Sequence, residues 1–235
     1  MRFFCVAAQP VIQQGGCEVE KVMVRRRQVK RVALRVLADG TVLVTAPPGM
    51  AIGPVLSRHA AWIAEKRARL DDLYAGHEAE EHCLLFDGRP CTLVAGNCCV
   101  YDAPSQQVEY TTLAALNRAL RKWLRADLAE RLERHAPRLG VTCGRVTIRM
   151  QRTRWGSCSA QGNLNFNLRL MALPAELRDY VVIHELAHRK IPNHSGKYWR
   201  FLEGFVPDAR RAEEDLKRYW VRIERNAVWS AVRDL

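Results

Sequence analysis

Three features that this sequence lacks each exclude a class of protein. None of its 235 residues lies in an apolar run that approaches the roughly 20 residues of a membrane-spanning helix. Its eight cysteines include no C-x-x-C pair, so a structural zinc site built on cysteine is not expected. Residues 1–17 carry one arginine and an apolar run broken by Gln9-Pro10, which is a poor match to a signal peptide. We therefore expect a cytoplasmic protein with mostly reduced thiols and no membrane partner.

Acidic residues are also scarce. The chain has 25 Asp and Glu residues against 37 Lys and Arg residues, which gives a net charge of +12. The imbalance is strongest near the N-terminus, where no acid interrupts a run of cations: Lys21, Arg25, Arg26, Arg27, Lys30 and Arg31. Such a run is compatible with nucleic-acid contacts by Arg25 to Arg31, and also with the solvated outer face of a hairpin, since no aromatic residue lies among the cations. Nucleic acid is therefore an open partner, because charge alone is a weak signal of specificity.

The motif with the most chemical content is His184-Glu185-Leu186-Ala187-His188, which has the pattern H-E-x-x-H. Residues four apart lie on one face of a helix, so the two imidazoles can bind one metal ion with Glu185 beside them. A catalytic zinc ion takes three protein ligands and leaves a position for water. A carboxylate beside it can accept a proton from that water and pass it to a leaving amine. The motif therefore predicts peptide hydrolysis with Glu185 as the general base.

The surrounding residues favour a buried helix over two histidines on a surface. The apolar residues that flank the polar trio are Val181, Val182, Ile183, Leu186 and Ala187. Buried polar groups need partners, and a shared metal ion is one. Pro174 suits the first turn of a helix and Pro192 suits a position after its end, which predicts a helix over about residues 174–190.

A third ligand must come from beyond this helix, and His194 is our candidate. It follows His188 by six residues, just past Pro192, where the chain can turn back. The spacing matches the metzincin pattern H-E-x-x-H-x-x-G-x-x-H, but Ile191 replaces the glycine and no methionine follows Met171, so a Met-turn is excluded. A thermolysin-like site would use a glutamate instead, and the candidates are Glu203, Glu213 and Glu214. We predict one zinc ion per chain, bound by His184, His188 and His194.

Several segments around the motif resemble the YgjP-like metallopeptidase family, which is related to the SprT and WLM-type zinc proteases. These segments are 152–159, 163–167, Asp179-Tyr180, the H-E-x-x-H helix, and Asn193-His194-Ser195 with Trp199. The part from about Arg25 through Ala46-Pro47 to Trp62-Ile63 fits as well, so the resemblance covers about residues 20–219. It implies zinc ligands at His184, His188 and His194 and a catalytic glutamate at Glu185. It says little about the substrate.

The predicted fold class is α+β, with a zincin-like core in which the H-E-x-x-H helix packs on a small sheet, preceded by an N-terminal α+β region. We expect a loose tail at 1–17, the N-terminal α+β region at 18–111, the zincin-like catalytic region at 112–219 and a peripheral extension at 220–235.

The N-terminal region begins with alternating apolar residues and a hairpin turn. Val22, Val24, Val32, Leu34 and Val36 face one way, and Asp39-Gly40 turns the chain into a strand with Val42 and Val44. Residues 52–74 follow a helical period that places His59 in the core, with a hydrogen-bond partner. Short strands are expected around 83–86, 91–95 and 107–111, with a turn at Asp87-Gly88.

The second half opens with an amphipathic helix over about 112–136, ended by Pro137 and Gly140, whose leucine stripe we assign to core packing. A strand at 146–150, a loop at 152–159 and a strand at 164–170 then lead to the metal-binding helix. This order resembles the upper half of a zincin, in which an edge strand can pair with an extended substrate. Further helices are expected at 195–205 and 207–219.

Five side chains are candidate contacts to a substrate or its oxyanion: Tyr180, Tyr198, Arg154, Trp155 and Asn165. The two tyrosines lie close in sequence to His184 and His194. Asn165 alternates with Asn163 and Asn167 on one strand face, which either lines the cleft or faces solvent. Cys158 is either close to the metal or, as we favour, a small buried thiol.

The sequence thus predicts a zinc metalloendopeptidase that acts on a peptide or protein. One alternative is a SprT-like protease that acts on DNA-bound proteins. Another is a basic nucleic-acid-binding protein in which zinc only supports the structure. A structural site has no need of Glu185 and usually recruits cysteines, which disfavours this last alternative.

Overall fold

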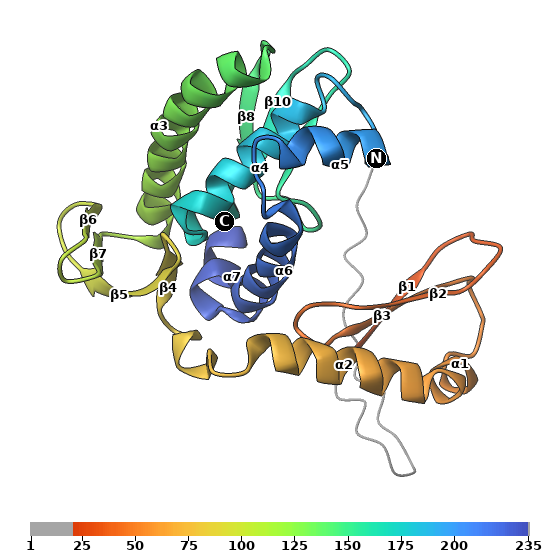
Figure 1. Cartoon of the computed structure of the whole chain (residues 1–235). Helices are drawn as coiled ribbons and strands as arrows, with labels where there is room; N and C mark the ends of the chain where they lie inside the picture. The colour runs from red at the N-terminus through yellow and green to blue at the C-terminus, as the bar shows by residue number, and fades with distance from the viewer. Residues whose placement is uncertain (1–20, 235) are drawn as a thin grey trace. The chain divides into compact units, whose positions relative to one another are not determined.

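The computed structural model describes residues 21–234, and the chain falls into two compact units that divide between Ala75 and Gly76 (Figure 1). The tail predicted at residues 1–17 lies outside the described residues. Small sheets and helices occur in both units, so the mixed α+β class predicted from the sequence is confirmed. Among the described residues, no helix has the length and apolar character needed to cross a membrane.

The first unit is built on a three-stranded sheet. Its strands are β1 (Val22–Arg26), β2 (Ala33–Val36) and β3 (Val42–Ala46), with β3 in the centre. β2 and β3 form the predicted hairpin, in which Asp39 accepts hydrogen bonds from Thr41 and Gly40 takes a φ of 80°, a value that favours glycine. β1 pairs with β3 in parallel and completes the sheet on its other side.

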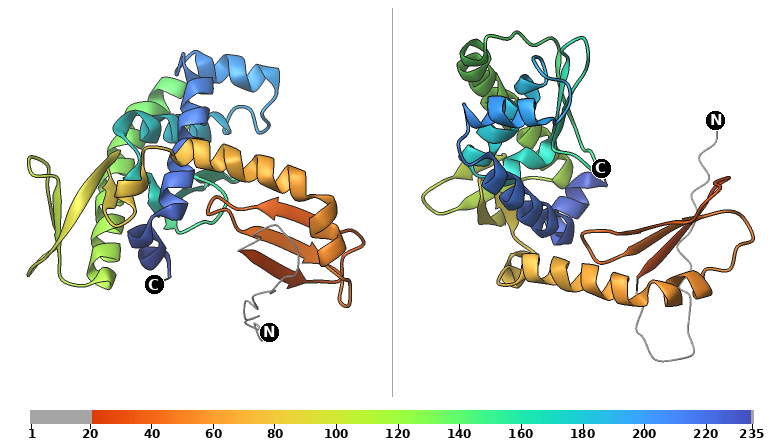
Figure 2. Two further views of the ribbon diagram at one scale, coloured as in Figure 1. Left: turned by 90° about the horizontal axis from the view of Figure 1, so that it is seen from below. Right: turned by 45° about the vertical axis from the view of Figure 1, so that its right-hand side comes forward.

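Two helices, α1 (Gly53–Arg58) and α2 (Ala60–Tyr74), pack on one face of this sheet (Figure 2). Ile52, Leu56 and Ile63 join Val42 and Val44 in a small core. The sequence predicts one helical stretch with His59 in the core, and this prediction is wrong at His59. His59 lies between the two helices with φ −106° and ψ 13°, and its side chain is exposed. The apolar neighbours on either side already fill the space against the sheet.

The second unit begins with a four-stranded sheet of order β4-β5-β7-β6. The strands are β4 (Leu84–Phe86), β5 (Arg89–Ala95), β6 (Val100–Asp102) and β7 (Gln107–Tyr110). Three of them match predicted strands, whereas β6 is not predicted. The turn at Asp87-Gly88 occurs as expected, with φ values of 48° and 80°. The boundary that we predict at residue 111 falls inside this second unit.

The long helix α3 (Leu113–Leu139) follows this sheet. It begins where Thr112 Oγ1 accepts a hydrogen bond from the N–H of Ala115, and it ends at Gly140 in the left-handed conformation. Pro137 lies inside the last turn, so the predicted end at 136 is three residues early. Leucines spaced along the helix are buried, which confirms core packing: Leu116, Leu120, Leu124, Leu128 and Leu132.

A second small sheet precedes the metal-binding motif. Its order is β8-β10-β9, from β8 (Val146–Arg149), β9 (Gly156–Cys158) and β10 (Leu164–Asn167). β9 lies within the segment that we predict as a loop. β10 ends at Asn167 rather than at 170, because the Asn167 side chain accepts a hydrogen bond from the N–H of Arg169 and starts a 3-10 helix, Leu168–Ala172.

The remaining helices are α4 (Ala175–Ala187), α5 (Gly196–Glu203), α6 (Ala209–Arg225) and α7 (Ala227–Arg233). α4 carries the H-E-x-x-H motif and contacts α3, α5, α6 and β9 (Figure 1). α6 continues beyond the predicted end at 219. The segment that we predict as a peripheral extension packs into the larger core, where Trp229 is fully buried and donates a hydrogen bond to the carbonyl of Leu85.

Candidate active site

Three imidazoles converge at the end of α4. His184 lies in its last turn, His188 caps its C-terminus, and His194 comes from the segment between α4 and α5. The Nε2 atoms of His184 and His194 are 3.1 Å apart, and one ligand nitrogen from each of the three rings lies within 4.8 Å of the others. Within residues 21–234 this is the one group of three or more side chains that could hold a metal ion, and it includes none of the three glutamates considered as rival ligands.

A sharp change of direction after α4 brings His194 back to the helix. α4 ends at Ala187, three residues before the predicted end, and the carbonyl of Ala187 accepts hydrogen bonds from the N–H groups of Lys190 and Ile191. The Ile191 side chain is buried in the core and so holds this turn against the unit. The turn therefore begins before Pro192, not at it.

The chemistry of the three imidazoles fits a zinc ion. Burial lowers the pKa of His184 to about 3, and the neighbouring His188 and His194 add to the shift. Burial also lowers the pKa of His188, although its hydrogen bond to the Ile191 carbonyl opposes the shift. That bond joins Nδ1 of His188 to the carbonyl at 3.2 Å and leaves Nε2 for a metal. Neutral imidazoles with converging nitrogens are good zinc ligands, and three of them leave one position open.

Tyr198 packs against the three histidines. Its side chain is fully buried, and its hydroxyl donates a hydrogen bond of 3.2 Å to the backbone carbonyl of His184. Its ring lies 4.8 to 5.4 Å from the rings of all three histidines, measured between centroids. We interpret Tyr198 as a support for the histidines, because its hydroxyl is already engaged with the backbone.

Tyr180 has a different environment. Its ring centroid lies 5.8 Å from that of His184, and burial raises the pKa of its hydroxyl. The hydroxyl is buried and has no hydrogen-bond partner in the described part of the chain. A buried polar group without a partner is costly, so this O–H is available to a ligand in a way that the hydroxyl of Tyr198 is not.

The Glu185 side chain projects from α4 toward the sheet of β8, β9 and β10, and the residue is 5% exposed. Its carboxylate forms no hydrogen bond or ion pair with any residue between 21 and 234. Burial raises its pKa to about 8, and the charge of Arg154 opposes that rise. A cation held by the neighbouring imidazoles would favour the charged form, so the carboxylate and the histidines are electrostatically complementary.

β9 approaches Glu185 so closely that only glycine fits at position 156. A Cβ atom on Gly156 would lie 2.6 Å from Oε1 of Glu185 and 2.8 Å from its Cγ. The glycine of the Trp155-Gly156-Ser157 segment thus has a physical role, because it lets an edge strand lie against the carboxylate.

The loop before β9 is held by Asn167. Its Nδ2 donates hydrogen bonds to the carbonyls of Gln151 at 2.8 Å and Arg154 at 2.9 Å. Asn167 therefore anchors the loop that carries Arg154, a role that strand alternation alone does not reveal. Asn165 is half-buried and accepts a hydrogen bond from Thr147 on β8.

Trp155 and Cys158 flank Gly156. The Trp155 ring packs edge-on against Trp220, with centroids 4.9 Å apart, and so faces the core. The candidate contacts in this region are Arg154, Trp155 and Asn165. Of these, Arg154 is the one whose charge lowers the pKa of Glu185. Burial raises the pKa of the half-buried Cys158 thiol, and the charge of Glu185 raises it further. Cys158 is not among the three potential metal ligands.

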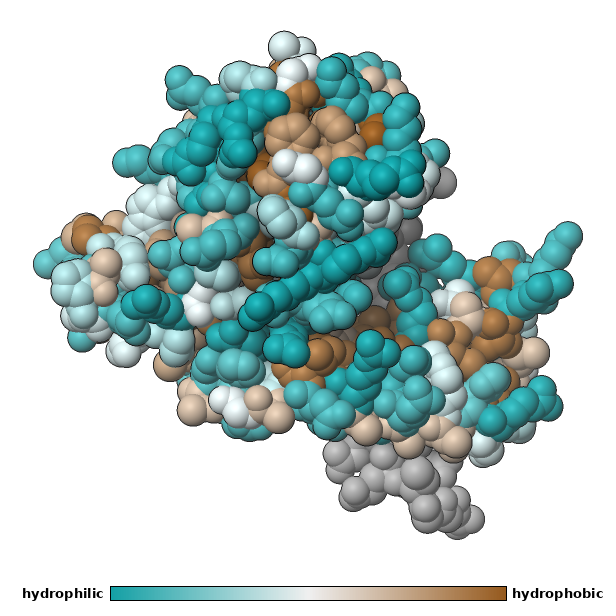
Figure 3. Space-filling model, in the orientation of Figure 1, coloured by the Kyte–Doolittle hydropathy of each residue, from teal (hydrophilic) through white to brown (hydrophobic). Residues whose placement is uncertain are grey.

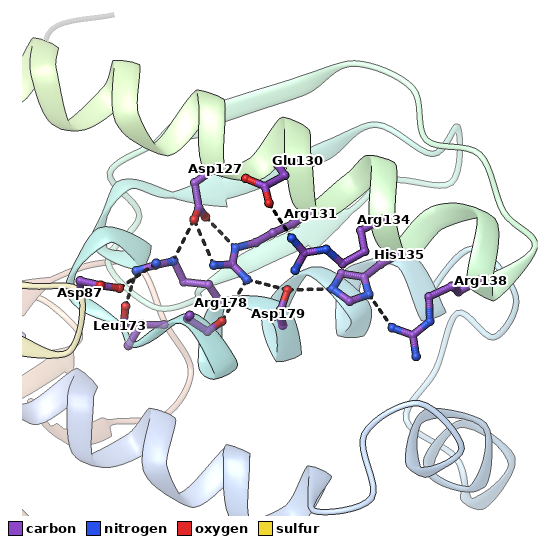
Figure 4. Close-up of polar contacts among 11 residues, drawn as sticks. Asp87, Asp127, Glu130, Arg131, Arg134, His135, Arg138, Leu173, Arg178 and Asp179 are labelled. Carbon is purple, nitrogen blue, oxygen red and sulfur yellow. Dashed lines mark hydrogen bonds and ion pairs between the residues drawn. The ribbon is translucent and has the colours of Figure 1, made fainter.

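A buried polar network fixes the first turns of α4 against α3 (Figure 4). Asp179 of α4 accepts from His135 Nε2 at 2.7 Å and pairs with Arg131, both from α3. Arg131 also pairs with Asp127, and Asp127 pairs with Arg178 of α4. None of the α3 members of this network is predicted from the sequence, although Arg131 and His135 lie one turn apart beside the leucine stripe.

The predicted nucleic-acid contacts belong to the first unit. Arg25, Arg26, Arg27, Lys30 and Arg31 are all exposed on β1 or just after it.

Comparisons with known proteins place this geometry in context. The model of the family described as "YgjP-like, metallopeptidase domain" matches residues 30–219. Among solved structures, the crystal structure of the metallopeptidase zymogen of Pyrococcus abyssi abylysin matches with 28% sequence identity and a TM-score of 0.36. That match covers 38% of this chain and 90% of the abylysin chain. No curated protein matches the sequence.

Proposed function

This chain belongs to the YgjP-like metallopeptidase family, and on that premise we propose that it is a zinc-dependent endopeptidase in which Glu185 acts as general base. Membership implies a peptidase that uses a metal ion. The observation that carries the finer proposal is the unpaired, buried Glu185 carboxylate beside three converging imidazoles. We propose one zinc ion per chain, held by His184, His188 and His194.

Glu185 and Arg154 have different roles beside the metal ion. When bound, the zinc ion would supply a Lewis acid that activates water and polarises the scissile carbonyl. Glu185 accepts the proton of the attacking water and delivers it to the leaving amine. Burial raises the pKa of Glu185 and the Arg154 charge opposes that rise. A zinc ion held by the imidazoles would favour the charged carboxylate, which is the form that accepts a proton.

The edge of β9 is the proposed binding site for the substrate backbone. The Trp155 carbonyl accepts from the N–H of Asn167, and the N–H of Ser159 donates to Asn163, so these residues point their backbone groups at β10. Because an antiparallel ladder alternates, Gly156 and Cys158 point theirs away from β10, toward the free edge. A peptide that pairs there lies beside Glu185. Pairing along a strand edge needs no free chain end, which supports an endopeptidase.

Tyr180 is the proposed donor to the oxyanion. It has a hydroxyl without a partner close to His184, whereas the Tyr198 hydroxyl is engaged. A donor aimed at the developing negative charge lowers the barrier only if it is held in place beforehand, and the burial of Tyr180 meets this condition.

A structural zinc site explains the same residues less well. It has no use for an unpaired carboxylate beside the ligands, and none of the three ligands is a cysteine. The SprT-like alternative, a protease that acts on DNA-bound proteins, shares the proposed chemistry and differs only in substrate.

Replacing Glu185 by Gln tests the proposal. Gln keeps nearly the same shape but cannot accept a proton, so we expect zinc to be retained and peptide cleavage to fall by about 10²- to 10⁴-fold. Zinc content by elemental analysis and cleavage of a peptide library give the two readouts. Glu203→Gln is the matched control, because Glu203 is exposed on α5 and should keep both zinc and activity. Full cleavage by E185Q with zinc bound would remove Glu185 from the mechanism.

A further inference from the structure

The sheet of the first unit has one face that no other element described within residues 21–75 covers. Helices α1 and α2 take the side formed by Val42, Val44 and their neighbours. The opposite side, which we call the open face, consists of the side chains that alternate with these: Met23, Arg25, Ala33, Arg35, Leu43 and Thr45. The strand register aligns them in two rows, Met23–Leu43–Arg35 and Arg25–Thr45–Ala33.

The open face carries positive charge and no acid. Arg25 and Arg35 are exposed on its two outer strands, and exposed cations continue from it along the chain: Lys21, Arg27, Lys30 and Arg31. None of these six forms an ion pair with an acidic side chain among residues 21–234. Asp39 is the one acid between residues 21 and 47, and it is engaged with Thr41 in the hairpin turn. Figure 3 shows hydrophilic side chains projecting around a smaller apolar area of this unit.

Arg26 does not belong to this surface, although the sequence groups it with its neighbours. Its guanidinium donates to the carbonyls of Pro47 at 3.0 Å and Met50 at 2.7 Å, and so ties the end of β1 to the segment after β3. Conversely, Arg35 lies on the open face although it is outside the run of cations at residues 21–31. The strand register places Arg25 and Arg35 on the open face and Arg26 on the opposite one.

We propose that the open face binds nucleic acid through its phosphates. A two-dimensional array of exposed cations without acids complements a polymer of closely spaced negative charges. The apolar side chains on the face, Met23, Ala33 and Leu43, are too few for insertion into a membrane. No aromatic side chain lies on the face, so bases cannot stack on it and binding is independent of sequence. This inference goes beyond the proposed peptidase activity and does not depend on it.

Salt dependence gives the size of the expected effect. Each cation that neutralises a phosphate of duplex DNA contributes about −0.9 to the slope of log K against log salt. Removing two such cations should therefore reduce the magnitude of that slope by about 1.8 and weaken binding about 30-fold at 0.15 M salt.

The test compares two double variants of the full chain that lose the same net charge. Arg25→Gln with Arg35→Gln removes the cations of the open face. Arg58→Gln with Arg69→Gln removes exposed cations from α1 and α2, the helices on the other side of the sheet. We expect the first pair to lose affinity for a labelled 20-base-pair DNA duplex by about 30-fold and the second pair to keep the parent slope. The single variants R25Q and R35Q replace the double variant if it fails to fold, and each should reduce the magnitude of the slope by about 0.9.

Three results would overturn the proposal. The first is no binding of the parent protein to duplex DNA, single-stranded DNA or single-stranded RNA at 50 mM salt. The second is an equal loss in both double variants, which would indicate a diffuse charge effect. The third is stronger binding to vesicles that contain phosphatidylserine than to nucleic acid. E185Q should bind nucleic acid as tightly as the parent protein does. The binding test therefore gives a clear answer even if the peptidase proposal fails.

Discussion

Adding one methyl group at Gly156 should impair catalysis without removing the metal ion. The Cβ of Gly156→Ala would lie 2.6 Å from Oε1, 2.8 Å from Cγ and 2.9 Å from Cδ of Glu185, where ordinary contacts begin at 3.4 Å. Glu185 is buried between α4 and β9, so either the carboxylate or the strand must move by about 0.8 Å. The three atoms nearest to the added Cβ all belong to Glu185, so the clash falls first on this side chain and not on an imidazole.

The size of the loss follows from that displacement. A misplacement of about 1 Å of a catalytic group can cost about 10²-fold in rate. We therefore expect G156A to lower kcat/KM by about 10- to 100-fold, which corresponds to about 1.4 to 2.7 kcal/mol of transition-state stabilisation. Overpacking should also lower the free energy of unfolding by about 1 to 3 kcal/mol.

The assay combines zinc content, kcat/KM for a cleaved peptide, and urea unfolding. Gly53→Ala is the matched control, because a Cβ at Gly53 meets nothing within 4 Å and the residue does not need a positive φ. In α1 it should leave activity unchanged. Repeating G156A in an E185A background isolates the contact, because the carboxylate that the new methyl group meets is then gone.

Two outcomes would refute this reasoning. If G156A keeps full kcat/KM, the position of Glu185 does not matter to the reaction at this scale. If G156A destabilises the parent and the E185A background equally, the strain does not arise from the contact between the methyl group and the carboxylate.

Two further predictions concern the metal and the polar network under α4. His194→Ala should lower zinc occupancy because it removes one of three converging nitrogens, whereas Glu213→Gln should not; the opposite result by elemental analysis would show that the third ligand is a glutamate. For Asp179, burial alone would raise its pKa, but hydrogen bonds and charge from Arg131 and His135 bring the pKa below its usual value. Its contribution to stability is therefore present above the ordinary carboxyl pKa of about 3.9 and lost as the pH falls through the lower folded-state pKa. Asp179→Asn should unfold more easily in urea at pH 7 and lose less stability between pH 5 and 3 than the parent; parallel curves would contradict this.

Local patterns in the sequence predict those elements that local interactions determine. The leucine stripe of α3 and the Asp39-Gly40 hairpin depend on residues close together in the chain, and both occur as predicted. β6 (Val-Tyr-Asp) and β9 (Gly-Ser-Cys) lack the apolar run that marks the equally short β4 (Leu-Leu-Phe). The parallel pairing of β1 with β3 and the burial of Trp229 depend on partners far away in sequence, and so carry no local signal.

The residues of the site also differ in how far the sequence alone predicts them. His184, Glu185 and His188 can be predicted because one helix sets their spacing. His194 needs only the additional assumption that the chain turns soon after the helix. The roles of Tyr198 and Asn167 cannot be predicted, because they depend on hydrogen bonds to backbone carbonyls that only the fold places within reach.

Three segments that resemble the family in sequence act on Glu185 directly or through the loop before β9, and this accounts for some of their residue types. α4 supplies Glu185 itself, β9 supplies a glycine because any larger residue would collide with it, and β10 supplies Asn167 to hold the loop before β9. Arg154, in that loop, then provides the charge that opposes the rise in the Glu185 pKa. A change at Gly156 or Asn167 should therefore alter Glu185, the proposed general base, rather than the metal ligands. That separation is what makes the Gly156 experiment informative, since it predicts loss of catalysis with zinc retained.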